Sequence, residues 1–450
     1  MDWLLLINNR INDIVWGPPI LFLIVGTGFY LSVFTGFFSV TKINYILRNT
    51  FSKMFSKETR GEGEVTAFQA VATALAATIG TGNIAGVATA IATGGPGAVF
   101  WMWLAAVVGM TTKFSEVVLA VNYREKTKDG RFVGGPMYYI ANGLGWKWLA
   151  YIFAAFGALA AFGIGNMVQS NSVATSLKAT FNINPLITGI VLAVITSMVT
   201  VGGIKRIGSF TEKLIPLMAS IYIIGGLAII FINIGKVPAS IGLIFGNAFT
   251  GHAAIGGFTG ATLRESIKYG VARGVFTDEA GLGSASIAHA AATTDHPVRQ
   301  GLWGIFEVFA DTIIICSITA LVIMISGVWN SGLSGVELTT KAFEAALPGG
   351  GYIVAISIVL FAFLTIIGWE YYGERCAEYL LGPGVLKLYK VIWVPFVIIG
   401  AIGGLEELWS LADTLNGLMS IPNLIGILLL SPVVFRLTKE FFTKERNLKG

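Results

Sequence analysis

The sequence predicts an all-α membrane protein with about eleven transmembrane helices. Of its 450 residues, 54% are hydrophobic and only 12% are charged, whereas about 25% of the residues in a soluble domain are charged. The mean hydropathy is +0.75. Several apolar runs also reach the roughly 20 residues that a helix needs to cross the hydrocarbon layer. A soluble core does not require this much apolar sequence, so we expect these runs to lie in lipid.

Most of the predicted spans are apolar runs with few charges. They occupy residues 17–38, 65–93, 97–121, 148–172, 185–201, 212–234, 302–326, 352–369, 390–405 and 411–435. The first run lacks the small-residue cleavage site of a secretory signal, so we expect it to remain as a span. One further span, 259–292, is seventh in chain order and brings the total to eleven; it is predicted to be broken because charged residues interrupt it, namely Arg264, Glu265, Lys268, Arg273, Asp278 and Glu279.

Basic residues are distributed unevenly over the loops between these spans. The odd-numbered loops and the C-terminal tail hold most of the lysines and arginines, and loops of this kind face the cytoplasm. We therefore expect a multi-pass protein of the plasma membrane, with the N-terminus outside and the C-terminus in the cytoplasm. The same pattern explains the net charge of +5 without nucleic-acid binding, because no aromatic platforms alternate with the basic residues. Cys316 and Cys376 lie far apart and predict no disulfide framework.

The second span is predicted to unwind in its middle. Gly80 and Gly82 bracket Thr81 there, and Asn83 follows. A glycine in a helix interior costs about 1 kcal/mol. Unwound backbone at membrane depth must line a cavity, because lipid cannot hydrogen-bond to free N–H and C=O groups. The alternative is a small-residue helix contact through Gly82 and Gly86. A phosphate-binding loop is excluded, because no strand precedes the glycines and no lysine follows them at the required spacing.

The second predicted break lies in the seventh span, where glycines and polar residues again interrupt a crossing segment (residues 273–286, RGVFTDEAGLGSAS). Acidic residues near the membrane midplane are costly and are usually functional or paired. Glu279 is the stronger functional candidate of the two acids, ahead of Asp278. Alternatively, Glu279 neutralises Arg273 or caps the second half-helix.

The spacing of the two breaks predicts an inverted repeat. Spans two to six and seven to eleven form two groups of five, and each group begins with its broken helix. Because five is odd, the two groups enter the membrane from opposite sides, as in many secondary transporters. Half-helix N-termini then face an anion and unwound carbonyls face a cation, which suits a zwitterion. The predicted parts are 1–64 (an extra span and a cytoplasmic loop), 65–235 and 236–435 (the two repeats, the second with a preceding extracellular loop) and 436–450 (a cytoplasmic tail).

Three motifs resemble one known family. Residues 77–86 (ATIGTGNIAG), 273–284 (RGVFTDEAGLGS) and 134–139 (GGPMYY) are similar to those of the alanine or glycine:cation symporters, within the amino acid-polyamine-organocation group. The resemblance covers nearly the whole chain, although this family often has Asn where the chain has Asp278. It implies the leucine-transporter-type fold, no catalytic residues and no cofactor. It also implies sodium-coupled import of alanine and glycine by alternating access.

The resemblance also implies a substrate site. The carboxylate is expected on the backbone N–H groups around Gly80 and Gly82, and the ammonium on carbonyls near Thr78, Phe276 and Thr277. The side chains expected to complete the pocket are Gln169 with nearby Asn166, Thr365, and Trp369, which would leave room only for a small substrate beside Phe276. The alternatives are interhelical hydrogen bonding for Gln169 and an interfacial anchor for Trp369.

A sodium site is implied between the first broken helix and the ninth span. Its expected ligands are the carbonyls of Ala76, Ile79 and Phe361 and the hydroxyl of Thr365, since oxygen suits a hard cation. Asn83 matches a residue that binds a second sodium in some relatives. Gating or pairing roles are expected for Arg273, Asp278 and Glu279, and Glu279 leaves proton coupling open.

Two other classes of protein fit the sequence less well. A membrane enzyme would need catalytic groups, but His252, His289 and His296 are scattered and form no i, i+4 metal-ligand pair. A channel would need rings of carbonyls or charges around an open pore, whereas the inverted repeat favours alternating access. The sequence leaves open the coupling cation, the enantiomer preference and the oligomeric state.

Overall fold

The computed structural model describes residues 2–54, 61–250, 260–403 and 406–447, which are almost entirely helical. The strands in this part of the chain, β1 (Glu125–Lys126) and β2 (Phe132–Val133), pair antiparallel. The first helices are α1 (Asp2–Val15), α2 (Pro18–Phe34), α3 (Phe38–Thr41), α4 (Ile43–Asn49), α5 (Ala67–Thr78), α6 (Ala85–Gly94), α7 (Ala98–Asn122), α8 (Pro136–Leu144), α9 (Lys147–Ala160), α10 (Val168–Phe181), α11 (Pro185–Thr200) and α12 (Gly203–Ile232).

The later helices are α13 (Val237–Asn247), α14 (Leu263–Asp278), α15 (Ser286–His289), α16 (Pro297–Val308), α17 (Ser317–Ser326), α18 (Gly335–Ala346), α19 (Gly350–Leu381), α20 (Leu386–Ile402) and α21 (Glu406–Asn447). Short 3-10 turns are η1 (Phe51–Lys53), η2 (Thr81–Asn83), η4 (Ile234–Lys236), η6 (Val328–Asn330) and η7 (Pro383–Val385). Two π-helical segments, η3 (Ala161–Met167) and η5 (Phe309–Cys316), join α9 to α10 and α16 to α17.

The prediction of an all-helical membrane protein is confirmed. Among the described residues, 8 helical segments are long and apolar enough to cross a membrane: Leu6–Phe34, Ala98–Asn122, Lys147–Phe181, Gly203–Ile232, Pro297–Ser326, Gly350–Leu381, Pro383–Ile402 and Ser410–Lys444. The other predicted spans are shorter or interrupted here, as α5 with α6, α11, and α14 with α15. The count of eleven crossings therefore stays a prediction.

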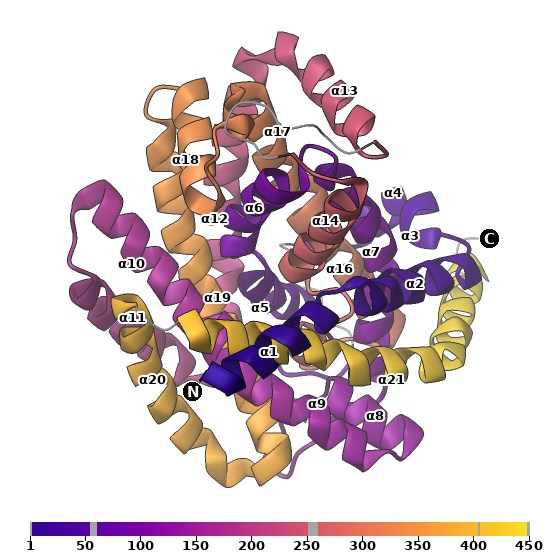
Figure 1. Cartoon of the computed structure of the whole chain (residues 1–450). Helices are drawn as coiled ribbons and strands as arrows, with labels where there is room; N and C mark the ends of the chain where they lie inside the picture. The colour runs from indigo at the N-terminus through magenta and orange to yellow at the C-terminus, as the bar shows by residue number, and fades with distance from the viewer. Residues whose placement is uncertain (1, 55–60, 251–259, 404–405, 448–450) are drawn as a thin grey trace.

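The discontinuous helices lie inside the bundle. Figure 1 shows α5, α6 and α14 in the middle of the molecule, with α10, α11 and α20 along one edge. α7 packs against both α14 and α16, and α19 packs against α5 and α10. Exposed apolar side chains cover the outer helices, for example Val194 on α11 and Val391 on α20. This arrangement is the one expected when lipid surrounds the bundle and polar groups gather inside it.

Two helices extend beyond the predicted spans. Helix α1 precedes the first predicted span and packs against α21, where the Asn12 side chain donates to Asp413 (3.1 Å) and Thr414 (3.0 Å). Helix α19 continues past residue 369 to Leu381, because its last turns bury Glu374 and Arg375 in ion pairs instead of exposing them. Hydropathy alone does not find either extension, since both carry polar residues whose burial and partners are known only from the structure.

Candidate functional site

The first break lies at the predicted glycines. Helix α5 starts with a capping box, in which Thr66 and Gln69 each accept a backbone N–H of the other (both 3.1 Å). It ends at Thr78, after which Ile79 and Gly80 are extended, and η2 leads into α6. The chain therefore crosses the middle of the bundle as two short helices joined by non-helical backbone.

Gly80 and Gly82 are surrounded by the side chains that were predicted to form the site. A Cβ atom built on Gly80 would lie 2.7 Å from Thr365 Oγ1 and 3.5 Å from Gln169 Oε1. A Cβ atom on Gly82 would lie 2.8 Å from Thr277 Cγ2 and 3.4 Å from Phe276 Cδ1. The two glycines thus let the backbone approach α10, α14 and α19 at distances that no other residue allows.

The small-residue alternative for Gly82 and Gly86 describes part of the same contact. A Cβ atom on Gly86 would lie 3.9 Å from Thr277 Cγ2, the methyl group that also faces Gly82. Both glycines therefore pack against α14. The break and the close helix contact occur together, so one does not exclude the other.

The second break follows α14. This helix also begins with a capping box, between Thr262 and Glu265, and it ends at Asp278. The backbone of Glu279 adopts the left-handed conformation (φ 54°), and Gly281 and Gly283 also have positive φ before α15 begins. Glycine adopts positive φ without steric cost. The seventh predicted span is therefore interrupted by a turn immediately after Asp278.

Glu279 does not pair with Arg273 as one alternative proposed. Its Oε2 accepts the Ser284 hydroxyl (2.5 Å), which holds the turn before α15. The Arg273 guanidinium instead lies over the ring of Phe276, 5.7 Å from its centroid. The prediction of a neutralising pair is wrong because Glu279 follows the end of α14 and its left-handed backbone turns it towards α15.

Gln169 is buried, with 3% of its surface exposed. Its Nε2 donates to the Ile164 carbonyl (3.1 Å), which fixes the orientation of the amide. Its Oε1 faces Gly80 and has no hydrogen-bond partner among the described residues. Buried polar atoms are nearly always paired, so this oxygen is a ready acceptor for a ligand. Asn166, in contrast, donates to the Trp393 carbonyl on α20 (3.0 Å) and holds two helices together.

Thr365 lies among the predicted sodium ligands. Its hydroxyl donates to the Phe361 carbonyl (3.0 Å) and lies 3.5 Å from the Ile79 carbonyl. Three of the four predicted oxygen donors therefore meet between α5 and α19. Ala76, the fourth, is fully buried in the last turn of α5. Thr78 is also in that turn, and its hydroxyl donates a hydrogen bond to the Ala74 carbonyl (3.2 Å).

Trp369 is not an interfacial anchor, because only 1% of its surface is exposed. It packs edge-on against Tyr372 and directly against Gly165, where a Cβ atom would lie 2.1 Å from the tryptophan Cβ. The large ring is therefore enclosed one turn after Thr365. The interfacial alternative is wrong because α19 continues for three further turns in the protein interior.

Asn83 connects the first break to a buried acid that the sequence reasoning did not name. Its Oδ1 accepts the Gly80 N–H (2.9 Å) and its Nδ2 donates to Asp311 Oδ1 (2.6 Å). The Thr312 hydroxyl then lies 2.9 Å from Asp311 and 3.2 Å from Asp278. A chain of polar contacts therefore joins the two breaks.

This arrangement corrects two expectations. The Gly80 N–H assigned to the substrate carboxylate is occupied by Asn83, and the Asn83 oxygen assigned to a second sodium is occupied by Gly80. The physical reason is local, because an asparagine side chain readily accepts a nearby backbone N–H in a turn. Asp311 could have been noticed as one of the two acids, with Glu307, in the otherwise apolar run 302–326.

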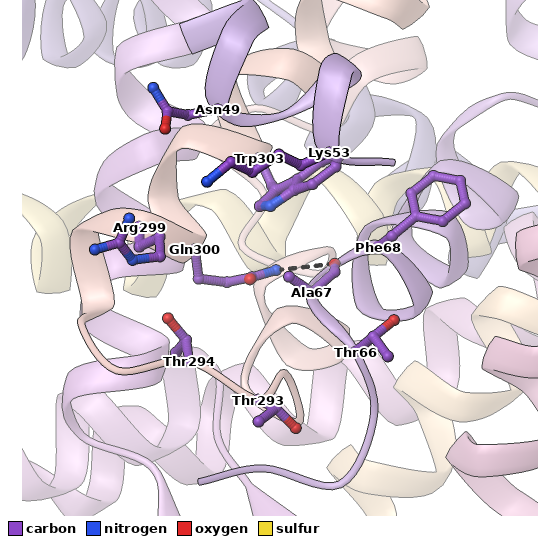
Figure 2. A pocket seen from close by; sticks show the side chains of 10 residues that line it. All are labelled: Asn49, Lys53, Thr66, Ala67, Phe68, Thr293, Thr294, Arg299, Gln300 and Trp303. Carbon is purple, nitrogen blue, oxygen red and sulfur yellow. Dashed lines mark hydrogen bonds between the residues drawn. The ribbon is translucent and has the colours of Figure 1, made fainter. Parts of the chain in front are cut away.

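A second buried polar network surrounds the turn after α14. Lys113 lies 3.5 Å from Glu307, which contacts His289 Nε2 (3.0 Å). Gln300 Nε2 contacts His289 Nδ1 (2.8 Å) and donates to the Ala67 carbonyl (3.4 Å) at the start of α5, a bond drawn in Figure 2. This network joins α7, α15 and α16 to the first discontinuous helix.

A small cavity of about 80 Å³ lies beside Gln300. Figure 2 shows the residues that line it: Asn49, Lys53, Thr66, Ala67, Phe68, Thr293, Thr294, Arg299, Gln300 and Trp303. None of these residues belongs to the predicted substrate or sodium site. The cavity lies instead at the N-terminal end of α5, more than two helical turns before the break at Gly80. His252, and residue 259 at the start of the predicted broken span, lie outside the described residues.

Comparison with known proteins gives the family context. A family model described as the sodium:alanine symporter family matches residues 1–449. The chain is 50% identical to the sodium/alanine symporter AgcS of Methanococcus maripaludis over 99% of each chain. It is 38% identical to two Bacillus subtilis proteins: the putative sodium/proton-dependent alanine carrier YrbD (97% of this chain, 92% of the relative) and the probable sodium/glutamine symporter GlnT (97% and 89%).

Two solved structures share the fold at low sequence identity. One is MhsT in complex with L-phenylalanine (TM-score 0.60, 12% identity, 84% of this chain and 98% of that one). The other is a Na+-coupled sialic acid symporter (TM-score 0.57, 14% identity, 92% and 86%). Both are transporters of the leucine-transporter type, so the predicted fold type is supported by structural similarity.

Proposed function

Because the chain belongs to the sodium:alanine symporter family, whose members are transporters and not enzymes, we propose that it imports alanine and glycine together with sodium. The observation that carries this proposal is the buried Gln169 oxygen, which lies beside the unwound backbone at Gly80 and has no partner among the described residues. A buried acceptor next to unwound backbone suits the ammonium group of a small zwitterion.

The substrate is proposed to lie between the two breaks. Its ammonium group would bind Gln169 Oε1 and the carbonyls near Thr78, Phe276 and Thr277. Its carboxylate would bind N–H groups around Gly82. The first N–H groups of a helical segment lack an intrahelical acceptor and favour an anion. The packing of Trp369 against Gly165 supports a pocket for small side chains.

Sodium is proposed to bind beside the substrate, between α5 and α19. Thr365 Oγ1 and the Ile79 and Phe361 carbonyls already lie together, and Ala76 is in the adjoining turn of α5. These are hard oxygen donors of the kind that sodium requires. A neutral zwitterion carried with one sodium ion moves one positive charge inwards, so a membrane potential contributes about 2.3 kcal/mol per 100 mV.

Proton coupling is the second candidate, and one observation favours it. Asp278, Glu279 and Asp311 are buried beside the breaks, and buried acids of this kind are used in proton relays. The name of YrbD includes both sodium and proton. We place sodium first because the clustered oxygen donors at Thr365 need no acidic residue.

The topology is part of the proposal. We propose eleven crossings, with α5 to α12 and α14 to α21 as two inverted repeats of five, the N-terminus outside and the C-terminus in the cytoplasm. Eight long helices support it, as do three shorter or interrupted segments that coincide with the other predicted spans. The unequal distribution of basic residues over the loops supports the orientation.

Ligand-dependent stabilisation of the purified protein tests the substrate and the cation together. Thermal unfolding would be followed with alanine, glycine, glutamine and leucine, each in sodium or in potassium buffer. Binding to the folded state raises the melting temperature. We expect alanine and glycine to stabilise the protein only with sodium. Stabilisation by glutamine or leucine but not by alanine would overturn the proposed substrate, and stabilisation by alanine that is equal in both buffers would overturn sodium coupling.

A further inference from the structure

A charged cavity lies away from the candidate site, where the ends of α11, α12, α19 and α20 approach the β1–β2 hairpin. Its volume is about 690 Å³. The polar residues that line it are Glu64, Asp129, Arg131, Lys205, Tyr371, Glu374, Arg375, Lys387 and Lys390. Figure 1 places α11 and α20 side by side at the edge of the bundle. The cavity opens at the outer surface, because its lining residues Val201 and Val391 are exposed.

Most of the acidic side chains that line the cavity form ion pairs with arginine or lysine. Arg131 pairs with Asp129 (2.6 Å) and Glu378 (2.8 Å). Arg375 pairs with Glu374 (3.1 Å) and also with Glu378 (2.5 Å). Lys390 lies 3.3 Å from Glu374 and donates to the Thr200 carbonyl (2.9 Å), which ends α11. The carboxylates of this network are therefore already neutralised by arginine or lysine.

Two lysines are left over. Lys205 and Lys387 line the cavity from α12 and α20, are exposed, and form no ion pair within the described part of the chain. Glu64 is the one lining acid without a cation at salt-bridge distance there. It accepts the Phe132 N–H (2.5 Å); burial raises the pKa of its carboxyl, and the charges of Arg375, Lys205 and Arg131 oppose that rise. The five basic side chains that line the cavity outnumber its three acidic ones, so the cavity presents an excess of positive charge.

Unsatisfied N–H donors face the same place. Helix α12 begins at the cavity wall, where its N-cap residue Gly202 provides no side-chain cap. The N-terminus of a helix of 30 residues offers free N–H groups and a partial positive charge. In addition, Arg375 is 6% exposed, and its Nε has no acceptor in the described structure. Donors and cations from three helices thus converge at the cavity, and in the described part of the chain no carboxylate pairs with Lys205 or Lys387.

The walls of the cavity indicate which anion it binds. Val201 and Val391 line it and are 71% and 68% exposed. They continue into the apolar outer faces of α11 and α20, where Met198 and Leu388 are also exposed. A soluble anion gains nothing from these walls, whereas acyl chains would cover them. Basic pockets between membrane helices are suited to anionic lipid headgroups.

We propose that this cavity binds the phosphate headgroup of an anionic phospholipid, with its acyl chains along α11 and α20. Lys205, Lys387 and the N-terminus of α12 would hold the phosphate, while the paired arginines would keep the cavity open. The phospholipid would add a further link between the ends of α11, α12, α19 and α20, which already pack against one another. The proposal is independent of the identity of the transported amino acid.

Native mass spectrometry of the full chain in detergent tests the proposal. Short-chain phosphatidylglycerol, short-chain phosphatidylcholine and inorganic phosphate would be titrated separately. The double variant Lys205→Gln/Lys387→Gln removes two charges at the cavity. Lys439→Gln/Lys444→Gln is the matched control, since both lysines are exposed on α21 and do not line the cavity. Equal melting temperatures without lipid would show that both variants fold.

We expect saturable binding of phosphatidylglycerol that the cavity variant weakens about 30-fold, from about 1 kcal/mol per basic residue near a lipid surface. The α21 control is expected to bind like the unmodified chain. The proposal would be overturned by inorganic phosphate binding as tightly as phosphatidylglycerol, which would indicate a site for a soluble anion. Equal binding of phosphatidylcholine, or equal effects of the two double variants, would also overturn it.

Discussion

Gln169 holds one amide hydrogen to the Ile164 carbonyl and presents its buried oxygen to Gly80. If this oxygen binds the substrate ammonium, Gln169→Ala removes a hydrogen bond to a charged group, which contributes about 1.5–3 kcal/mol. We expect the KM for alanine to rise about 10- to 100-fold, measured as uptake into liposomes. Asn166→Ala is the matched control on the same segment, because Asn166 bonds Trp393 instead. Equal effects of the two variants would show that Gln169 is only structural.

A substitution at Gly82 tests whether the site depends on the close approach of the broken helix to α14. Gly82→Ala would place a methyl group 2.8 Å from Thr277 Cγ2, and overpacking of this kind costs about 1–3 kcal/mol. We expect uptake to fall by about tenfold or more. Thr277→Ser removes the opposing methyl group and keeps the hydroxyl that donates to the Gly274 carbonyl, so it should restore part of the activity in the double variant.

Gly26→Ala provides the control for that experiment. A Cβ atom at Gly26, in α2, would have no neighbour within 4 Å, so this substitution should leave uptake unchanged. If Gly82→Ala were as active as Gly26→Ala, the backbone at the break would have room to move, and the site would not depend on a close contact.

The contact between Asn83 and Asp311 links the two helix breaks. If ligand binding requires this contact, the two breaks form one binding site. Asp311→Ala leaves the Asn83 amide without its 2.6 Å acceptor, and an unsatisfied buried donor costs about 1–3 kcal/mol. We expect the sodium-dependent rise in melting temperature with alanine to be lost. Asp311→Asn retains a carbonyl acceptor and should keep part of it. Loss in both variants would indicate that the charge of Asp311 is required, and no loss in either would show that the breaks are independent.

Both interruptions could be predicted from sequence because their causes are local. Glycines, Thr81 and Asn83 disfavour a helix wherever they occur together, and the charges of 273–286 conflict with lipid in any arrangement of helices. The approach of Gly80 to Gln169 and Thr365 was also anticipated, but only through the family resemblance. No property of the residues near Gly80 indicates which distant helices will face it.

The polar network between helices could not be predicted in this way. Asn83 and Asp311 are 228 residues apart in sequence, and their pairing depends on how η2 and η5 pack. The hydropathy pattern likewise predicted that the ninth span ends at Trp369. Glu374 and Arg375 are charged and therefore predict a loop, whereas the structure buries them as an ion pair within α19. The π-helical turn of η5, which turns Asp311 towards Asn83, has no simple sequence signal either, although such turns are frequent at functional sites.

The orientation of the whole molecule is open to a direct test. Cys316 and Cys376 are both buried, so a single new surface cysteine should dominate labelling by a membrane-impermeant maleimide. Lys439 on α21 and Lys236 in η4 are both exposed. We expect Lys236→Cys to react in intact cells and Lys439→Cys only after permeabilisation. The opposite pattern would invert the topology, and reaction of both in intact cells would contradict the proposed number of crossings.

Coupling of alanine to sodium is the central claim, and uptake of radiolabelled alanine by the protein reconstituted in liposomes tests it most directly. An inward sodium gradient should drive accumulation above the external concentration, and an inside-negative potential should increase it, since each transported charge gains about 2.3 kcal/mol per 100 mV. Potassium in place of sodium should abolish accumulation. Accumulation driven equally well by a proton gradient without sodium would contradict the claim, as would alanine flux that merely equilibrates in every gradient.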